Sequence, residues 1–375
     1  MTMDVPFLDL GRHHTPIREE VLAAWAAIYD SSGFVSGAHV ASFESAFAAA
    51  HGASHTVAVA NGTVALELAL RAVGIGPGDQ AIVQANTFIA TAEAVSNVGA
   101  EPLFVDCNAN AGIDVEQAVE AMARPDVRAV LPVHLYGHPA DLDPILDAAG
   151  RHGVTVIEDA AQAHLATYRN QSVGSFGAAA GFSFYPGKNL GAPGEGGAIT
   201  TNDDALAARL RSLADHGQAA KYHSDLVGTN ARMIELVAAM LEIKLARLAE
   251  MTEARRRVAD MYRALLDGSD LVELPQEAPW AEPVYHLFVV EVDARDRVQE
   301  LLAARGIATG LHYPVPLHLQ PAYGHLGYTD GAFPVAERRA ERLLSLPMFP
   351  ELTDVEVETV AKGLLEVTDE VGHHG

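Results

Sequence analysis

Short apolar runs alternate with amphipathic stretches through the first two thirds of the 375-residue chain. Alternating strand and helix patterns are typical of a largely parallel sheet covered on both faces. Strands buried on both faces have continuous apolar sequences, as these runs do. The pattern therefore predicts an α/β fold with a mostly parallel sheet between helices. The expected strands are Thr56–Ala60, Ala81–Gln84, Leu103–Val105, Ala129–Val133 and Val154–Ile157, and the expected helices are Val64–Val73, Ala90–Val98 and Asp141–His152.

The pattern changes in the last half of the chain. Two more apolar runs, Ala179–Phe184 and Gly197–Thr200, flank the glycine-rich loop Tyr185–Gly196, and a loop of this length is usually functional. Domains hold roughly 100–200 residues, so the length predicts two. We expect a large domain over residues 1–250, with the N-terminal segment included, and a small α/β domain over 251–375. The further expected elements are helices Asp203–Ala214, Met233–Leu265, Arg297–Arg305, Val335–Leu344 and Asp354–Val367, and strands Tyr285–Val292 and Ala308–Tyr313.

The formal net charge is −24, with 49 acidic and 25 basic residues. Such a surface repels nucleic acid and anionic membranes, so a phosphate-bearing ligand must be held by backbone amides, helix N-termini and a few placed cations. No stretch approaches the length of a membrane span. The single cysteine, Cys107, permits no intrachain disulfide, and Met1–Asp9 lacks the features of a signal peptide. We therefore expect a cytoplasmic protein with no nucleic-acid or membrane partner and no metal site.

Lys188 is the first candidate for chemistry, because it lies just beyond an apolar run inside the glycine-rich loop. A lysine becomes a nucleophile when its amine is desolvated or crowded by other cations, and a position beside a buried strand supplies that environment. Lysines are mostly exposed, so an ordinary solvated lysine is the alternative on this segment alone.

Asp159 follows the expected strand Val154–Ile157, at the carboxyl end where ligands bind in open α/β sheets. A carboxylate at this place suits pyridoxal phosphate (PLP), whose ring nitrogen must stay protonated if the ring is to accept electrons. Neighbouring Glu158 is the competitor for this role. A helix N-cap is the alternative for Asp159, and one residue can serve both purposes.

Other residues near these strand ends could hold a phosphorylated ring. Asn61-Gly62-Thr63 follows a strand and opens a helix, whose terminal amides bind phosphate without a cation, and Ser183 could add a hydroxyl. Phe88 could stack on a planar ring, with a core phenylalanine as the alternative. Gln162 falls three residues after Asp159, on the same side if a helix begins there.

Taken together, these segments resemble the DegT/DnrJ/EryC1/StrS family of nucleotide-sugar aminotransferases over nearly the full chain. The resemblance rests on many ordered matches, of which those around Asp159 and Lys188 are the most specific. The matching segments are Val5–Leu10, Ala60–Leu66, Asn86–Thr91, Val133–Gly137, Ile157–Gln162, Ser183–Asn189, Gly228–Met233, His312–His318 and Leu346–Pro350.

The resemblance implies fold type I of the PLP enzymes, working as a homodimer. It implies that Lys188 carries PLP as a Schiff base and that Asp159 partners the pyridine nitrogen. It further implies that Gln162 binds the ring hydroxyl, that Phe88 lies against the ring, and that an asparagine of the partner subunit reaches the phosphate, so that each active site needs both chains. The residues that match the phosphate-binding positions are Gly62, Thr63, Ser183 and, for the partner's asparagine, Asn230.

The resemblance also implies the reaction: transfer of an amino group from L-glutamate to a keto group of a nucleotide-linked deoxyhexose. The product would serve amino-sugar biosynthesis for a secondary metabolite, such as an antibiotic, or for a cell-surface glycan. Lys188 would move the proton in both half-reactions, with pyridoxamine phosphate formed in between. The candidate substrate-binding residues are Tyr185, His312, Tyr313, Lys221, Tyr222 and His318.

Three other functions remain to be weighed. A PLP-sensing regulator on the same fold normally needs a DNA-binding appendage, and the sequence has no basic extension. Sugar dehydratases of the family carry histidine in place of Lys188. A nicotinamide dehydrogenase would need G-x-G-x-x-G after an early strand, which is missing. The segment Pro186–Ala192 resembles that of enzymes acting on dTDP-linked 3-keto sugars, and this resemblance implies a 3-keto sugar in preference to a 4-keto sugar.

Overall fold

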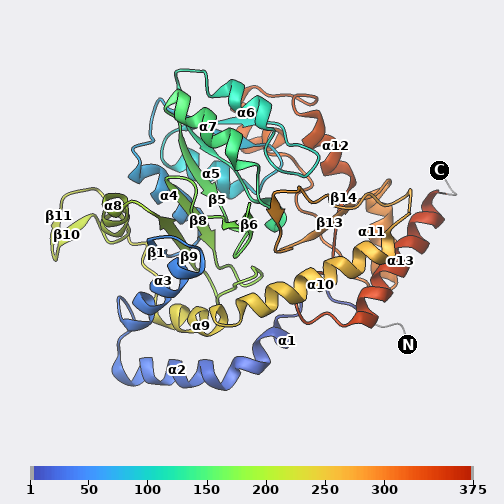
Figure 1. The fold of residues 1–375 in the computed structure, drawn as a ribbon, viewed down its shortest axis with the longest axis horizontal. Helices are drawn as coiled ribbons and strands as arrows, with labels where there is room; N and C mark the ends of the chain where they lie inside the picture. Colours follow the sequence, from blue (N-terminus) through green and yellow to red (C-terminus); the bar gives the residue numbers. More distant parts are fainter. Residues whose placement is uncertain (1–3, 373–375) are drawn as a thin grey trace.

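The computed structural model describes residues 4–372 and is built around a seven-stranded sheet (Figure 1). The parallel pairs are β2–β3, β2–β4, β4–β5 and β5–β8, whereas β9 runs antiparallel to both of its neighbours, β8 and β1. The prediction of a mostly parallel mixed sheet is therefore confirmed. In spatial order the strands are β1 (His55–Val59), β9 (Gly197–Thr201), β8 (Ala179–Ser183), β5 (Thr155–Asp159), β4 (Val127–Leu131), β2 (Gln80–Gln84) and β3 (Glu101–Val105).

Alternate residues of the central strands pack in two hydrophobic cores, one on each face of the sheet, because successive side chains of a strand point to opposite sides. On β1, Val57 and Val59 face one core and Ala58 faces the other. The first core is covered by α4 (Gly62–Ala72), α5 (Ile89–Asn97) and α8 (Asp204–Ala214). The second is covered by α3 (Ala38–Ala50), α6 (Val115–Ala121), α7 (Leu142–His152) and α9 (Glu235–Leu245).

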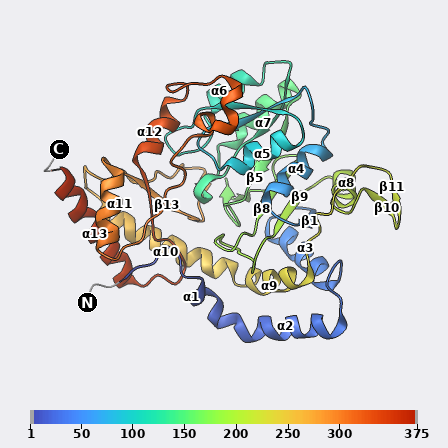
Figure 2. The ribbon, with the colours of Figure 1, turned by 180° about the vertical axis from the view of Figure 1, so that it is seen from behind.

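A third core lies at one end of the molecule, where α11 and α13 appear in both Figure 1 and Figure 2. It is built from C-terminal elements and includes Val5 near the N-terminus, which forms a bridge with Ile307. The predicted boundary between residues 250 and 251 stays a prediction. The elements of this core are α10 (Leu248–Leu266), α11 (Arg295–Ala304), α13 (Asp354–Gly372) and the antiparallel pair β13 (Phe288–Glu291) and β14 (Leu343–Leu346).

The remaining elements lie at the surface or join the layers. A hairpin, β10 (Gln218–Ala220) with β11 (His223–Ser224), projects from the end of the molecule opposite to α13 (Figures 1 and 2). Within residues 4–372, no helix combines the length and apolar character needed to span a membrane. The other elements are α1 (Leu10–His14), α2 (Arg18–Ser31), α12 (Pro334–Arg342), β6 (Thr167–Tyr168), β7 (Gln171–Ser172), β12 (Ala281–Glu282) and four 3-10 turns, Thr15–Ile17, Leu135–Gly137, Leu317–Leu319 and Pro321–Leu326.

The prediction of one helix over Met233–Leu265 was wrong, because two helices occupy that stretch. α9 ends at Leu245, and α10 begins at Leu248 after its N-cap Arg247, whose φ is −109° and ψ −3°. α9 belongs to a core of the central sheet, whereas residues of α10 such as Val258 and Tyr262 belong to the third core. The sequence is helical on both sides, and packing in two different cores decides where it breaks.

Two C-terminal predictions also need correction. Residues Ala308–Tyr313 do not form a strand; only Gly310 forms an isolated bridge, with Ser345. The helix predicted to run to Leu344 ends at Arg342, because Leu343 is extended and opens β14, which pairs with β13. Strand pairing with a distant segment decides both outcomes, and local pattern does not contain that information.

Candidate active site

Asp159 marks the carboxyl edge of the sheet, because β5 continues to this residue. Asp159 is 5% exposed, and its carboxylate accepts hydrogen bonds from Thr91 Oγ1 at 2.7 Å and from the Ala161 amide at 3.1 Å. Burial raises the pKa of Asp159 above its ordinary value, while those hydrogen bonds and the charge of Lys188 oppose the shift. No helix begins after Asp159, since residues 160–166 form turns, so the N-cap alternative does not apply.

Glu158, the competitor of Asp159, points to the other face of β5 and is fully engaged there. Its carboxylate accepts hydrogen bonds from the amides of Gly174 at 2.7 Å, Phe176 at 2.9 Å and Gly177 at 2.9 Å. It also lies 3.1 Å from His134 Nε2. Burial opposes ionisation of Glu158, but the hydrogen bonds from His134 and the amides hold its pKa below the ordinary value.

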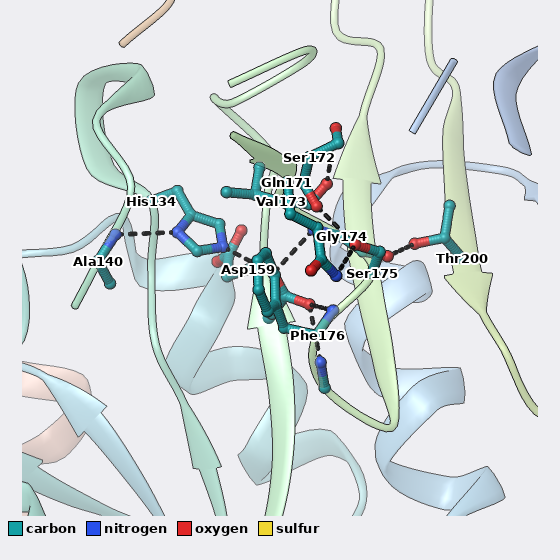
Figure 3. Close-up of polar contacts among 12 residues, drawn as sticks. His134, Ala140, Asp159, Gln171, Ser172, Val173, Gly174, Ser175, Phe176 and Thr200 are labelled. Carbon is teal, nitrogen blue, oxygen red and sulfur yellow. Dashed lines mark hydrogen bonds and ion pairs between the residues drawn. The ribbon is translucent and has the colours of Figure 1, made fainter. Parts of the chain in front are cut away.

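The tautomer of His134 follows from its other contact. Its Nδ1 accepts from the Ala140 amide at 3.1 Å (Figure 3), so the proton resides on Nε2 and faces Glu158. The backbone amide of His134 in turn donates to the Asp159 carbonyl at 3.0 Å. This buried pair therefore fixes the strand end and the Gly174–Gly177 turn behind the site, and leaves Asp159 as the carboxylate at the edge.

Lys188 lies in the loop between β8 and β9, which folds back on itself. Its amide donates to the Tyr185 carbonyl at 2.8 Å, and the Ala192 amide donates to the Phe184 carbonyl at 2.7 Å. The side chain is partly buried, and burial lowers the pKa of Lys188 to about 8, with the Asp159 carboxylate opposing the shift. Lys188 is thus not a solvated surface lysine, and its amine loses its proton far more readily than an ordinary one.

Gln162, Tyr313 and Phe88 lie together beside Asp159. The Gln162 Oε1 accepts from the Tyr136 amide at 2.6 Å, and its Nε2 donates to the Tyr313 hydroxyl at 3.1 Å. Burial raises the pKa of Tyr313 to about 12, so its hydroxyl stays protonated. Phe88 is 49% exposed, with its ring centroid 5.2 Å from that of Tyr313. Phe88 is therefore not a core residue; its ring is available to a planar ligand.

The start of α4 packs directly against the end of β8. Asn61 Oδ1 caps the helix by accepting from the Val64 amide at 2.9 Å, and Gly62 and Thr63 form its first turn. A Cβ on Gly62 would lie 2.6 Å from the Ser183 Cβ, so only glycine allows this approach. The amides of a helix N-terminus and a hydroxyl thereby meet at one place, which suits a phosphate group.

His312 contacts β14, a strand of the third core, whereas Tyr185 is exposed to solvent. The His312 Nδ1 lies 2.8 Å from Ser345 Oγ, and its ring stacks on Phe7 with centroids 5.7 Å apart. Burial lowers the pKa of His312 to about 4, so the ring is neutral. Tyr185 is 56% exposed at the start of the lysine loop.

Four predicted residues are not brought to this group within the described chain. Asn230 is exposed and is bonded to Arg232, while Lys221 and Tyr222 contact each other at the tip of the β10–β11 hairpin. His318 is buried among aromatic rings, with its Nε2 2.8 Å from Glu337. None of the four forms a hydrogen bond, ion pair or ring contact with Lys188, Asp159 or their neighbours in residues 4–372.

Sequence reasoning missed the side chains that hold the site residues in place. Thr91 binds Asp159, Tyr136 binds Gln162 through its amide, and Asn189 links the lysine loop to the Val284 carbonyl at 3.0 Å and to His286 Nδ1 at 3.2 Å. Thr91 was within reach, because it lies in the first turn of α5, four residues after Thr87, and the hydroxyls of the two threonines are 3.2 Å apart. The other contacts join segments far apart in sequence, which no local spacing indicates.

The arrangement places a lysine amine whose pKa is lowered to about 8 within electrostatic reach of the buried Asp159 carboxylate. A half-exposed aromatic ring lies beside Tyr313, and a helix N-terminus packs against the end of the neighbouring strand β8. An amine of this kind can attack a carbonyl and then serve as a proton carrier. The fold and the site together define a fold type I transferase that works through a bound aldehyde cofactor. A phosphorylated pyridine ring fits the donors and acceptors that are present.

Comparison with known proteins agrees with this class. The model of the DegT/DnrJ/EryC1/StrS aminotransferase family matches residues 15–365, and the chain belongs to that family. The crystal structure of Streptomyces venezuelae DesV in complex with a ketimine intermediate superposes with a TM-score of 0.96 at 44% identity, covering 98% of this chain and 99% of that one. The predicted fold, the aminotransferase class and PLP as the cofactor are thereby confirmed.

Three similar proteins differ in the substrate or the role that their names state. A dTDP-3-amino-3,4,6-trideoxy-alpha-D-glucose transaminase from Streptomyces venezuelae is 46% identical, over 94% of this chain and 93% of that protein. A UDP-N-acetyl-3-dehydro-alpha-D-glucosamine 3-aminotransferase from Acidithiobacillus ferrooxidans is 44% identical, over 95% and 96%. A "pleiotropic regulatory protein" from Geobacillus stearothermophilus is 43% identical, over 97% and 98%. The relatives that are named as enzymes here are sugar transaminases that differ in both nucleotide and sugar.

The buried Glu158 gives a prediction about stability. Glu158→Gln should lower the free energy of unfolding by about 3 kcal/mol at pH 7, because one partner of a buried charged network is lost. The folded-state pKa of Glu158 is depressed, so its contribution is present above the unfolded-state pKa and is lost as the pH falls through the folded-state value. The difference between wild type and variant should therefore shrink below about pH 4.5.

Urea denaturation at fixed protein concentration, repeated across pH, measures that difference. Glu358→Gln, at an exposed position on α13, is the control and should change stability little at any pH. A gap between wild type and Glu158→Gln that stays constant from neutral to acid pH would contradict the assigned charge state of Glu158.

Proposed function

We propose that this protein transfers an amino group from L-glutamate to a keto group of a nucleotide-linked deoxyhexose, with Lys188 as the catalytic residue. The observation that carries the proposal is the juxtaposition of Lys188, with its lowered pKa, and the buried Asp159 at the carboxyl edge of the sheet. The family relationship supports amino transfer, and the names of several relatives support a nucleotide sugar as the acceptor.

The described residues fit PLP at each of its polar groups. Lys188 Nζ would hold the aldehyde, Asp159 the ring nitrogen, and the Nε2 of Gln162 the ring hydroxyl. The amides of Gly62 and Thr63 and the hydroxyl of Ser183 would hold the phosphate, and Phe88 would lie on the ring face. Gly62 packs so closely on Ser183 that a Cβ at this position would lie 2.6 Å from the Ser183 Cβ, which brings the helix amides and the Ser183 hydroxyl together.

PLP, when bound, supplies an electron sink for the carbon next to the amino group. The protein supplies proton transfer and orientation. Lys188 Nζ would take the proton that leaves Cα of the donor, and its lowered pKa suits it to accept and release protons near neutral pH. Asp159 would hold the proton on the ring nitrogen, and a cation at that nitrogen would in turn favour the ionised form of Asp159.

Binding of the sugar would use residues around the ring and at the entrance. His312 and Tyr313 line the site with a neutral imidazole and a protonated hydroxyl, and Tyr185 stands exposed at its rim. These are groups that hydrogen-bond hydroxyls without demanding a charge. His318 is engaged by Glu337 away from this group, so we assign it no part in binding.

We further propose that two copies of the chain form a dimer that shares its active sites. Exposed apolar side chains cluster where Tyr29 meets Phe34 and where Val35 bridges Ile234, and apolar patches of this kind usually mark interfaces. Asn230 lies four residues before Ile234 and is itself exposed. In the dimer, Asn230 would reach the phosphate in the partner's site, and the hairpin that carries Lys221 and Tyr222 would approach its substrate.

A regulatory role without catalysis is the second candidate, because one relative carries a regulatory name. The two functions differ in their response to an amino donor. An aminotransferase loses the visible absorbance of lysine-bound PLP when L-glutamate alone is added, whereas a sensor keeps it. With a net charge of −24, the protein is not expected to have a basic surface that binds DNA.

Lys188→Ala tests the catalytic assignment. The variant should lose the visible absorbance of lysine-bound PLP and at least roughly a hundredfold in turnover, because both the attachment point and the proton carrier are removed. Lys362→Ala, on the exposed surface of α13, is the control and should match wild type in both. A Lys188→Ala protein that retains both the visible absorbance and the turnover with glutamate would contradict the assignment.

Mixed dimers test the shared site. Dimers of Lys188→Ala are inactive, and those of Asn230→Ala should lose roughly tenfold or more in PLP affinity, since a charge-assisted hydrogen bond is worth about 1.5–3 kcal/mol. A heterodimer of the two has one site with both Lys188 and Asn230 intact. Co-refolding at limiting PLP should therefore raise activity above the sum of the two parents; simple additivity would show that each chain supplies its own Asn230.

A panel of acceptors tests the substrate. We expect L-glutamate-dependent amination of a dTDP-linked 3-keto deoxyhexose in preference to its 4-keto isomer and to UDP-linked sugars, on the basis of the Pro186–Ala192 segment and the dTDP-named relative. Mass spectrometry of the products, with the position of the amine fixed by NMR, measures the preference. Efficient amination of a UDP-linked or 4-keto sugar alone would contradict it.

A further inference from the structure

A second lysine lies beneath the loop that carries Lys188. Lys244, at the end of α9, is only 1% exposed, and its Nζ donates a hydrogen bond of 2.5 Å to the Gly191 carbonyl. No carboxylate in residues 4–372 forms an ion pair with it. Glu351 attracts its charge and Arg255 repels it, and burial lowers the pKa of Lys244 to about 8.

A lysine is a costly residue at this position. Moving an ammonium out of water costs several kcal/mol, and an apolar side chain of similar length would pack there without that cost. The hydrogen bond to Gly191 is the one contact of Lys244 Nζ that an apolar side chain could not make. Lys244 also lines a pocket of about 260 Å³ together with His13, Arg247 and Glu351, and this pocket has room for water.

The loop around Gly191 is closely packed, so it has little freedom to move the Gly191 carbonyl toward another hydrogen-bond donor. A Cβ on Gly191 would lie 2.1 Å from the Pro186 carbonyl oxygen, so the two ends of the loop touch. Leu190 and Ala192 are fully buried on either side. Without Lys244, a buried carbonyl would be left unpaired three residues from Lys188, and such a group favours local rearrangement.

The opposite side of Lys188 is held through its neighbour Asn189. The Asn189 Nδ2 donates to the Val284 carbonyl, and its Oδ1 lies next to His286 Nδ1. Val284 belongs to the core of the central sheet, and His286 precedes β13. Lys188 thus stands between two anchors, one from α9 and one from the segment that leads into the third core.

We propose that Lys244 is a positioning residue that fixes the Lys188 loop by holding the Gly191 carbonyl from α9. The proposal rests on the proposed function of Lys188. Lys244 touches neither cofactor nor substrate, so its removal acts on the placement of Lys188 Nζ and leaves the binding groups in place. Loss of placement affects proton transfer more than binding, because small displacements of a reacting group lower the rate steeply.

Lys244→Met, which keeps the length and removes the donor, tests the proposal in the full-length holoenzyme. We expect kcat to fall roughly ten- to hundredfold while KM for L-glutamate and for the sugar changes little. The pH titration of the visible absorbance of lysine-bound PLP should also shift its midpoint. Lys244→Arg, which retains a donor, should recover part of kcat.

Thr252→Val is the matched control, because Thr252 is buried on the adjoining helix α10 and its hydroxyl donates only to Leu248. It should lower thermal stability and leave kcat and the titration unchanged. Lys244→Met with the kcat and titration of wild type would overturn the proposal, whatever its stability. If Lys244→Met does not fold, Lys244→Leu, which also lacks a donor, is compared with Lys244→Arg, and equal kcat in these two overturns it.

Failure of this proposal is distinguishable from failure of the proposed function. A wild-type protein that neither binds PLP at Lys188 nor transaminates refutes the function itself. A fully active wild type with a fully active Lys244→Met refutes only the role of Lys244.

Discussion

The electrostatic interaction between the Lys188 amine and the Asp159 carboxylate is the one on which the rest of the site depends. Both groups lie where the protein excludes most water, so each is shifted toward its neutral form and each stabilises the charge of the other. Such a pair is costly to bury without ligands. A ligand with a carbonyl for the amine and a basic nitrogen for the carboxylate would satisfy both, which is why a pyridine aldehyde fits.

The fold keeps these two groups apart and in place through the order of its strands. Asp159 ends β5, Ser183 ends β8, and the loop with Lys188 returns into β9. Parallel pairing of β5 with β8 sets Asp159 opposite Gly181, so the donors for the ring and for the phosphate leave neighbouring strands at one edge. On the far face, the buried pair of Glu158 and His134 is hydrogen-bonded to the Gly174–Gly177 turn. This pair therefore makes the strand end that carries Asp159 rigid.

Much of this could be predicted from the sequence, for reasons that differ between residues. Strands buried on both faces have a composition that is visible locally, so the sheet could be predicted, and the segments around Asp159 and Lys188 carry the family resemblance. The break at Arg247, the pairing of β14 with β13 and the contacts of Lys244 and Asn189 could not be predicted, because each depends on a partner far away in sequence. Glu158 could be separated from Asp159 only once the direction of each side chain was known.

The covalent attachment of PLP to this chain is the central claim, and it can be measured on the protein itself. Reduction of the PLP-loaded enzyme with borohydride, followed by proteolysis and tandem mass spectrometry, locates the attachment. The account predicts one phosphopyridoxyl group per chain, on the peptide that contains Tyr185–Gly196 and on Lys188 within it. Label on Lys244, Lys221 or Lys362 instead, or no label after saturation with PLP, would contradict it.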